Sequence, residues 1–201
     1  MGYIKLIVCF FILISTIQAR TIVFLGDSLT SGYDISTKHS FPAIIEKKVA
    51  SDSITIINAG VPGDTTNDLL ERLQIVIKNT KPDTVFICIG ANDGLRGYKT
   101  TLIESNLQQI INILNSHNIL IVLAGMKLPN YSPPIYRKSF ESIFKRISDK
   151  NQLIFYPFLL QDVAMNKELN IQDQMHPNEK GHQVIATNIF EFLVTNNIIL
   201  K

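Results

Sequence analysis

A serine, a glycine, an asparagine and a histidine–aspartate pair stand in four short blocks that together could hydrolyse an acyl bond. The blocks are residues 25–29, 58–60, 90–93 and 173–177. A serine activated by a histidine can attack an acyl carbonyl, and N–H groups can hold the negative charge that develops on its oxygen. An aspartate bonded to the histidine keeps the ring oriented. The four blocks therefore predict acyl transfer through a covalent acyl-enzyme intermediate.

Ser28 is the candidate nucleophile. It follows an apolar run and Gly26, which has no Cβ and permits a sharp turn. The serine is then expected at the start of a helical turn, where backbone N–H groups are free to meet a developing negative charge. Serine is also a common helix cap, and this residue alone does not separate the two roles.

Two further residues are candidates for stabilising an oxyanion. Gly60 offers a backbone N–H, and Asn92 offers an uncharged side-chain amide. Both residue types are also frequent in turns, and the loop after Gly60 leads to a helix that Thr65 or Thr66 could cap. We expect the neighbouring Asp93 to stabilise its loop rather than to take part in the chemistry.

Asp173 and His176 are three residues apart in one segment. This spacing lets the carboxylate bond one ring nitrogen while the other nitrogen faces the serine. Pro177 restricts the backbone of His176 and suits the first turn of a following helix. The alternative is a surface histidine at a helix start. The remaining histidines lack such a partner and are interpreted as surface or structural residues: His39, His117 and His182.

Strand-like runs alternate with helical patterns along the chain. The five runs are short, apolar and β-branched, as strands covered on both faces should be. They span residues 21–26, 54–58, 84–90, 119–124 and 153–156. Between them, apolar residues recur at helical spacing. These faces are marked by Leu69, Leu73, Val76 and Ile77, by Ile103, Leu107, Ile110 and Leu114, and by Ile185, Ile189, Phe192 and Leu193.

This alternation predicts an α/β fold with a parallel sheet and helices on both faces. In such open sheets, ligands bind outside the carboxyl ends of the strands. Ser28, Gly60 and Asn92 each follow a predicted strand. We therefore expect them to meet at one edge of the sheet, although they are far apart in the sequence.

Length and charge exclude several classes of function. The 201 residues suit one domain with a full core, and 46% hydrophobic residues are too many for a disordered chain. The net charge of +2 is too small to argue for nucleic acid or for acidic membranes as partners.

The first nineteen residues resemble a secretory signal peptide. Lys5 precedes an apolar run, and Ala19 provides a small residue at the expected cleavage point. The apolar run is too short to span a membrane comfortably; the alternative is an uncleaved N-terminal anchor. Cleavage would leave one domain, residues 20–201, with Cys88 as its only cysteine. Cys88 lies in an apolar run, so we expect it to be buried and unreactive.

The quoted blocks resemble the four signatures of the SGNH, or GDSL, hydrolase family. They read Gly26-Asp27-Ser28-Leu29, Gly60, Gly90-x-Asn92-Asp93 and Asp173-x-x-His176. Their flanks are similar to those of the periplasmic esterases of this family, a subgroup also described as arylesterases, acyl-CoA thioesterases and lysophospholipases. The similar flanks are residues 58–66, 92–97, 127–131 and 175–178.

The resemblance implies a flavodoxin-like three-layer α/β/α fold with five parallel strands. It implies that Ser28 is the nucleophile, His176 the general base and Asp173 the residue that orients the histidine. The Ser28 N–H, the Gly60 N–H and the Asn92 side chain would form the oxyanion hole. It implies no metal and no cofactor. We expect a monomer exported to the periplasm, without stable membrane insertion, acting on a small acyl ester or lipid.

Four apolar residues near the expected site favour substrates with long acyl chains. They are Leu95, Leu128, Tyr131 and Met175. The sequence departs from the family at Gln174-Met175 and at residues 132–134, so substrate preference carries over less safely than chemistry. One alternative is an O-acetyl esterase acting on cell-envelope carbohydrate. Another is a flavin-binding carrier, for which the hydroxyl-rich loop 28–32 could hold a phosphate, although the chain has no tryptophan to stack on a flavin.

Overall fold

The chain is built on one sheet of five parallel strands, in the order β2-β1-β3-β4-β5. This computed structural model describes residues 20–49 and 53–199, so the expected leader, residues 1–19, lies outside the described residues. The predicted α/β class and parallel five-stranded sheet are confirmed. The strands are β1 (Arg20–Gly26), β2 (Ile54–Gly60), β3 (Thr84–Cys88), β4 (Leu120–Ala124) and β5 (Ile154–Tyr156).

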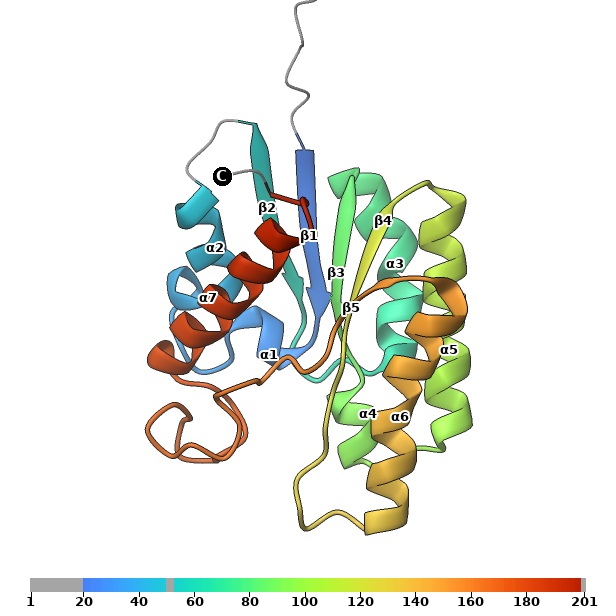
Figure 1. The fold of residues 1–201 in the computed structure, drawn as a ribbon, viewed down its shortest axis with the longest axis vertical. Coiled ribbons are helices and arrows are strands. Elements are labelled where there is room, and N and C mark those ends of the chain that lie inside the picture. The colour runs from blue at the N-terminus through green and yellow to red at the C-terminus, as the bar shows by residue number, and fades with distance from the viewer. Residues whose placement is uncertain (1–19, 50–52, 200–201) are drawn as a thin grey trace, which may run out of the picture.

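Helices cover both faces of the sheet (Figure 1). On one side lie α2 (Phe41–Val49) and α7 (Glu179–Thr195), which pack against each other. On the other side lie α3 (Thr66–Thr80), α5 (Thr100–Ser116) and α6 (Pro134–Asn151). Two short helices, α1 (Ser28–Ser31) and α4 (Ala91–Leu95), follow β1 and β3, and a 3-10 turn spans Thr37–His39.

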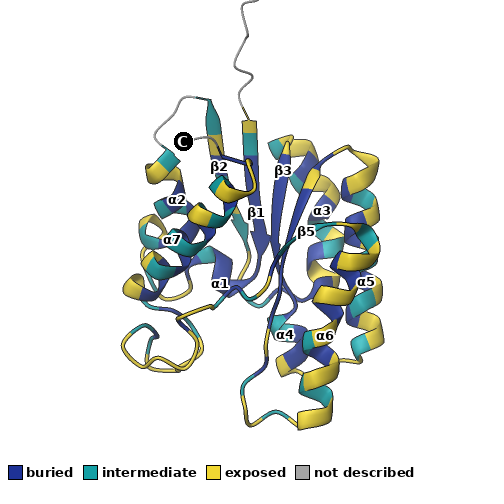
Figure 2. Cartoon of the chain, viewed as in Figure 1, coloured by how far each residue is buried: buried dark blue, intermediate teal, exposed yellow. Residues whose placement is uncertain are grey.

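The apolar faces that the sequence predicted form the core. All five residues of β3 are buried, as are the faces of α3, α5 and α7 that meet the sheet (Figure 2). Val76 and Phe192 are partly buried and pack against the edge of this core. No helix among residues 20–49 and 53–199 is long and apolar enough to cross a membrane.

The register of the sheet aligns the ends of three strands. Gly26 of β1 pairs with Gly60 of β2 on one side and with Cys88 of β3 on the other. The segments that leave these strands therefore start at the same level. They meet at the lower end of the view in Figure 1, where α1 and α4 lie. This is the edge at which we expected the candidate residues to gather.

The carboxyl ends of two strands differ from the prediction, each by two residues. The third strand ends at Cys88 rather than at Gly90, because Gly90 has a left-handed backbone (φ 109°) that starts α4. The second strand continues through Gly60, which places that glycine inside the sheet rather than in the loop after it.

Candidate active site

Ser28 begins a sharp turn between β1 and the body of the fold. A Cβ added to Gly26 would lie 2.1 Å from the Thr30 Oγ1 atom and 2.5 Å from the Cys88 carbonyl oxygen, so only glycine fits there. The Asp27 side chain caps the turn by accepting the Leu29 N–H at 3.0 Å. Ser28 lines a cavity directly after this turn.

His176 bridges Ser28 and Asp173. The Ser28 Oγ lies 2.9 Å from His176 Nε2, and His176 Nδ1 lies 2.5 Å from Asp173 Oδ2. With the proton on Nδ1, the ring donates to the carboxylate and accepts from the serine hydroxyl. The structure therefore brings together the three residues that the sequence singled out, and their hydrogen bonds have the geometry of a serine–histidine–aspartate triad.

Asp173 is held as a charged carboxylate. Its Oδ1 accepts the backbone N–H groups of Met175 and His176 at 2.8 and 2.9 Å. Partial burial disfavours the charge, but these bonds and the bond to the His176 ring outweigh it and lower the pKa of Asp173. The acceptor that orients His176 is thus ionised at neutral pH.

The segment that carries His176 is supported differently from the prediction. Pro177 forms an isolated antiparallel bridge with Asn170, and α7 begins two residues later. Asn178 caps that helix by accepting the N–H groups of Lys180 and Gly181. The proline therefore restricts the backbone at this bridge, before the helix, rather than in the first turn of the helix.

Two of the expected oxyanion donors are open to the site. Ser28 is the first residue of α1, so its N–H has no partner within the helix. One N–H of the Asn92 side chain donates to the Asp64 carbonyl oxygen at 2.8 Å, which fixes the amide and leaves its second N–H for a ligand. Ser28 and Asn92 line the same cavity.

The third expected donor, Gly60, is already paired. Its N–H donates to the Asn58 side chain at 3.0 Å, and it lines a separate hollow that Ser28 does not border. A Cβ at Gly60 would lie 2.4 Å from the Ser31 backbone nitrogen. Glycine is needed at this position for close packing against α1, and the expectation of an oxyanion donor does not fit its hydrogen bonding.

Gly63 is a candidate that the sequence analysis missed. The other N–H groups of residues 61–66 have acceptors, which are Gly26 O for Val61, Val61 O for Asp64, Asp68 Oδ2 for Thr65 and Asp93 Oδ2 for Thr66. Among the described residues, the Gly63 N–H has none. Gly63 has φ 87°, and a Cβ there would meet nothing within 4 Å, so its surroundings are open. Nothing in the sequence separated Gly63 from Gly60, because both are glycines in the short segment that joins the second strand to the next helix.

A buried hydrogen-bond network joins α4 to α3. The Asp93 carboxylate accepts the N–H and the hydroxyl of Thr66 at 2.9 and 2.6 Å, and Asn106 of α5 donates to the same hydroxyl. Asp93 is buried, and that burial raises its pKa. It stabilises the turn that presents Asn92, as the sequence analysis expected.

Arg72 is a supporting residue that no sequence motif announced. From α3 it donates to Asp64 Oδ2 at 2.6 Å and to the carbonyl oxygens of Gly26 and Ala59 at 3.1 and 2.9 Å. It thereby ties the ends of β1 and β2 to the loop that contacts Asn92. In the sequence it is one polar residue of an amphipathic helix.

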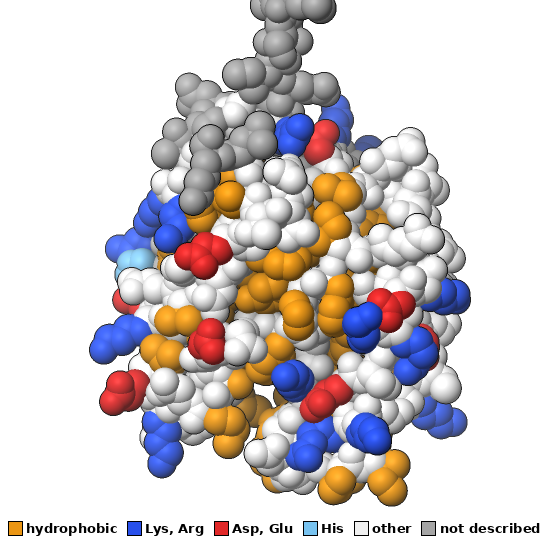
Figure 3. All heavy atoms as spheres, in the orientation of Figure 1, with side chains coloured by type: hydrophobic (Ala, Val, Ile, Leu, Met, Phe, Trp, Pro, Cys, Tyr) orange, Lys and Arg blue, Asp and Glu red, His pale blue; other side chains and the backbone are white. Residues whose placement is uncertain are grey.

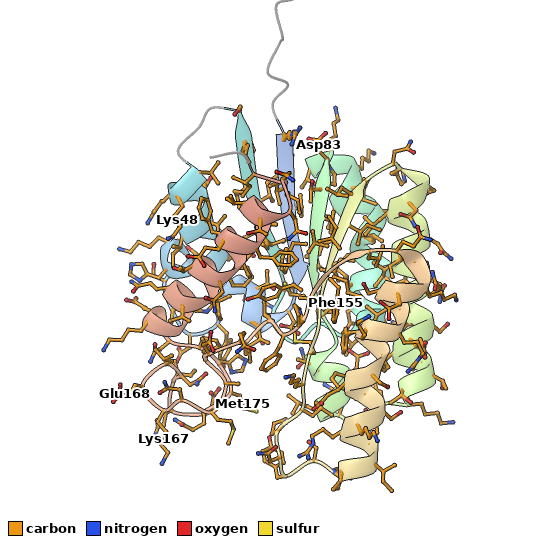
Figure 4. The ribbon with its side chains drawn as sticks, viewed as in Figure 1. Lys48, Asp83, Phe155, Lys167, Glu168 and Met175 are labelled. Atoms are coloured by element: carbon orange, nitrogen blue, oxygen red, sulfur yellow. The ribbon has the colours of Figure 1, made fainter. Side chains whose placement is uncertain are left out.

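An apolar cavity of about 340 Å³ opens beside the triad. Leu95, Leu128 and Met175 line it as expected, together with Met126, Phe158 and Leu160. Figure 3 shows apolar side chains beside a hollow at this end of the molecule, and Figure 4 places Met175 on the loop before α7.

Tyr131 does not line this cavity. Its ring is 77% exposed, and its hydroxyl contacts the Met175 sulfur at 3.8 Å across the rim. This contact joins the two loops that flank the cavity mouth, and a contact between Tyr131 and the substrate stays a prediction.

The described part of the chain has neither a cluster of metal-binding side chains nor a reactive cysteine. Residues 20–49 and 53–199 contain no group of three or more His, Cys, Asp or Glu side chains that could hold a metal ion. Cys88 is free and buried in β3, and burial raises the pKa of its thiol well above the usual value. Such a thiol is a poor nucleophile.

Fold and site together define a serine hydrolase, and comparisons with known proteins agree. The profile of the GDSL-like Lipase/Acylhydrolase family matches residues 24–184, and the chain belongs to this family. An arylesterase of Vibrio mimicus is 31% identical over 191 residues, covering 94% of this chain and 96% of that protein. Thioesterase 1/protease 1/lysophospholipase L1 of Escherichia coli K12 is 31% identical over 168 residues, covering 84% and 80%.

A solved structure gives the same result. The psychrotrophic esterase EstA from Pseudoalteromonas, inhibited by monoethylphosphonate, superposes with a TM-score of 0.83 at 30% identity, covering 88% of this chain and 97% of that one. The protein is a serine esterase that hydrolyses acyl esters. A flavin-binding carrier has no support among these relatives.

Proposed function

We propose that Ser28, His176 and Asp173 hydrolyse esters and thioesters of long acyl chains, including lysophospholipids, through an acyl-Ser28 intermediate. The observation that carries this proposal is the hydrogen-bonded chain from Ser28 through His176 to Asp173 at the mouth of an apolar cavity. The names of the relatives, arylesterase and thioesterase/lysophospholipase, support the same range of substrates.

In the first step, Ser28 Oγ attacks the acyl carbonyl while His176 Nε2 takes the hydroxyl proton. The oxyanion is stabilised by the Ser28 N–H, the free N–H of Asn92 and the Gly63 N–H, which takes the place expected for Gly60. Each donor of this kind contributes about 3 kcal/mol to lowering the barrier. His176 then protonates the departing alcohol or thiol, and a water activated by the same nitrogen releases the acid.

The apolar cavity argues for a long acyl chain rather than an acetyl group. Each buried methylene contributes about 0.8 kcal/mol, which is roughly a fourfold gain in kcat/KM while the chain stays inside the cavity. An acetyl group would leave most of this apolar lining in contact with water. An O-acetyl esterase would gain nothing from such a cavity.

The test is hydrolysis of p-nitrophenyl esters from two to sixteen carbons, with a chelator present, by residues 20–201. We expect kcat/KM to rise with chain length, and Ser28→Ala to abolish turnover at every length. Ser116→Ala, at an exposed serine on the last turn of α5, is the matched control and should behave as wild type. Turnover that persists in Ser28→Ala would refute the serine mechanism, and a maximum at the acetyl ester would refute the long-chain preference.

We also propose that residues 1–19 are a signal peptide and that the enzyme acts in the periplasm. The support is the order of Lys5, the apolar run and Ala19. Expression of the full chain in a Gram-negative host should release a periplasmic protein whose N-terminus is Arg20. An intact N-terminus recovered with the membrane fraction would contradict it.

A further inference from the structure

A second carboxyl group lies against the nucleophile, and the mechanism above does not use it. Asp27 directly precedes Ser28, and its side chain is fully buried. Its Oδ1 accepts the Leu29 N–H at 3.0 Å. Its Oδ2 has no hydrogen-bond partner. Among the described residues, the only other buried side-chain nitrogen or oxygen without a partner is Thr30 Oγ1, in the same turn.

The surroundings of Asp27 do not neutralise a negative charge. Asp64, before α3, and Asp93, on α4, face it with charges of the same sign. Cys88 of β3 faces it with a neutral thiol. Arg72 of α3 reaches this end of the sheet, but its guanidinium is already paired with Asp64 and with backbone carbonyl oxygens.

A buried carboxylate without a cation and with one empty oxygen costs much more than the neutral, protonated carboxyl at the same position. Burial, followed by repulsion from Asp64 and Asp93, raises the pKa of Asp27 to about 7, and the Leu29 N–H offsets only part of this rise. At neutral pH a large share of the molecules therefore carries a neutral carboxyl at this position.

We propose that Asp27 is a positioning residue that works in its protonated form, holding the Ser28 turn through the Leu29 N–H without placing a charge behind the oxyanion site. This inference rests on the proposed role of Ser28 as nucleophile. When Asp27 ionises, its carboxylate competes with the oxyanion for the same end of α1, so the transition state is less stabilised. Activity then requires a neutral His176 and a protonated Asp27.

The consequence is an alkaline limb in the pH–rate profile. Above about pH 7, activity should fall as Asp27 ionises. In the alkaline limb, kcat should fall by roughly tenfold per pH unit if the ionised form is inactive. A p-nitrophenyl ester has no ionising group of its own, and its product can be followed at the isosbestic wavelength of p-nitrophenol.

The decisive variant is Asp27→Asn, which keeps the acceptor for Leu29, supplies an N–H where the protonated carboxyl has its O–H, and cannot ionise. We expect it to keep kcat within about threefold of wild type at pH 6 to 7 and to lose the alkaline limb. Asp27→Ala, which removes the acceptor, should be slow at every pH. Asp149→Asn, at an exposed aspartate on α6, is the control and should keep the wild-type profile.

Two results would overturn the proposal. One is a folded Asp27→Asn variant whose alkaline limb is unchanged. The other is a folded Asp27→Asn variant that is inactive at all pH values, which would mean that the negative charge of Asp27 is needed. If the variant does not fold, carbon NMR of the Asp27 carboxyl in wild-type protein decides, since titration near neutral pH supports the proposal and titration below pH 5 refutes it. Retained activity in Ser28→Ala would instead refute the proposed site itself.

Discussion

The His176 ring is fixed from three sides. Asp173 accepts from Nδ1, the Ser28 hydroxyl meets Nε2, and the Tyr33 ring lies 4.6 Å away between centroids. The His176 carbonyl oxygen also accepts the Ile171 N–H at 2.8 Å, which anchors its backbone. A general base held in this way needs no rearrangement before it takes a proton.

Asn92 gives the most direct prediction at the residue scale. Asn92→Ala removes one oxyanion donor, so kcat should fall by about 10² to 10³ while KM changes little. The change is measured by steady-state kinetics on a medium-chain ester, with thermal unfolding to show that the fold survives. Asn112→Ala on the outer face of α5 should leave kcat unchanged. An increase in KM with an unchanged kcat would show that Asn92 binds the substrate without acting on the oxyanion.

The sequence was most informative where the chemistry is local. Asp173 and His176 are three residues apart, so their contact follows from one short segment. Gly60 ends β2 and Gly63 follows three residues later, and choosing between them requires knowing which N–H groups already have acceptors. Asn58, Thr65 and their partners decide that, and a sequence does not display such pairings.

At the scale of elements, the network between α3 and α4 positions the oxyanion side of the site. Thr65 caps α3 in a capping box with Asp68, and Thr66 follows it with both of its polar groups bound to Asp93. The first turn of α3 and the turn that carries Asn92 are thus joined by buried hydrogen bonds.

Removal of Asp93 should loosen this junction. Asp93→Ala leaves the buried N–H and hydroxyl of Thr66 without their acceptor, and we expect a loss of about 2 to 4 kcal/mol in the free energy of unfolding. Urea denaturation measures it, with Asp149→Ala as an exposed control that should stay within about 0.5 kcal/mol of wild type. Equal stabilities for the two variants would show that the network is not a structural tie.

The strands could be predicted as short apolar runs, and α3, α5 and α7 from apolar residues at helical spacing, whereas α2 and α6 were not among the predicted helices. By contrast, α1 and α4 contain four and five residues, too few for a period to appear. These two helices carry Ser28 and Asn92, so the least predictable elements are those at the site.

At the scale of the whole molecule, two buried titratable groups act on stability in opposite directions. Burial raises the pKa of Asp27 from 3.8 to about 7, so its favourable contribution is complete at acid pH and is lost as the pH rises through 7. Burial lowers the pKa of His182 from 6.5 to about 4, so its contribution is complete above pH 6.5 and is lost as the pH falls to 4. Their effects largely offset each other in wild-type protein.

Asp27→Asn should separate the two effects. Because asparagine cannot ionise, the free energy of unfolding of this variant relative to wild type should increase by on the order of 4 kcal/mol between pH 4 and pH 8. Urea denaturation of both proteins at the two pH values measures this difference. A stability difference that is the same at both pH values would show that Asp27 does not change its protonation state between them.

The claim that Ser28 is the nucleophile has a direct chemical test. Wild-type protein is incubated with a p-nitrophenyl alkylphosphonate, and the modified peptide is identified by mass spectrometry. We predict one adduct per chain, on Ser28, with activity lost in proportion, and no adduct on the Ser28→Ala variant. Inactivation with the label on any other residue, or full labelling of Ser28→Ala, would contradict the account.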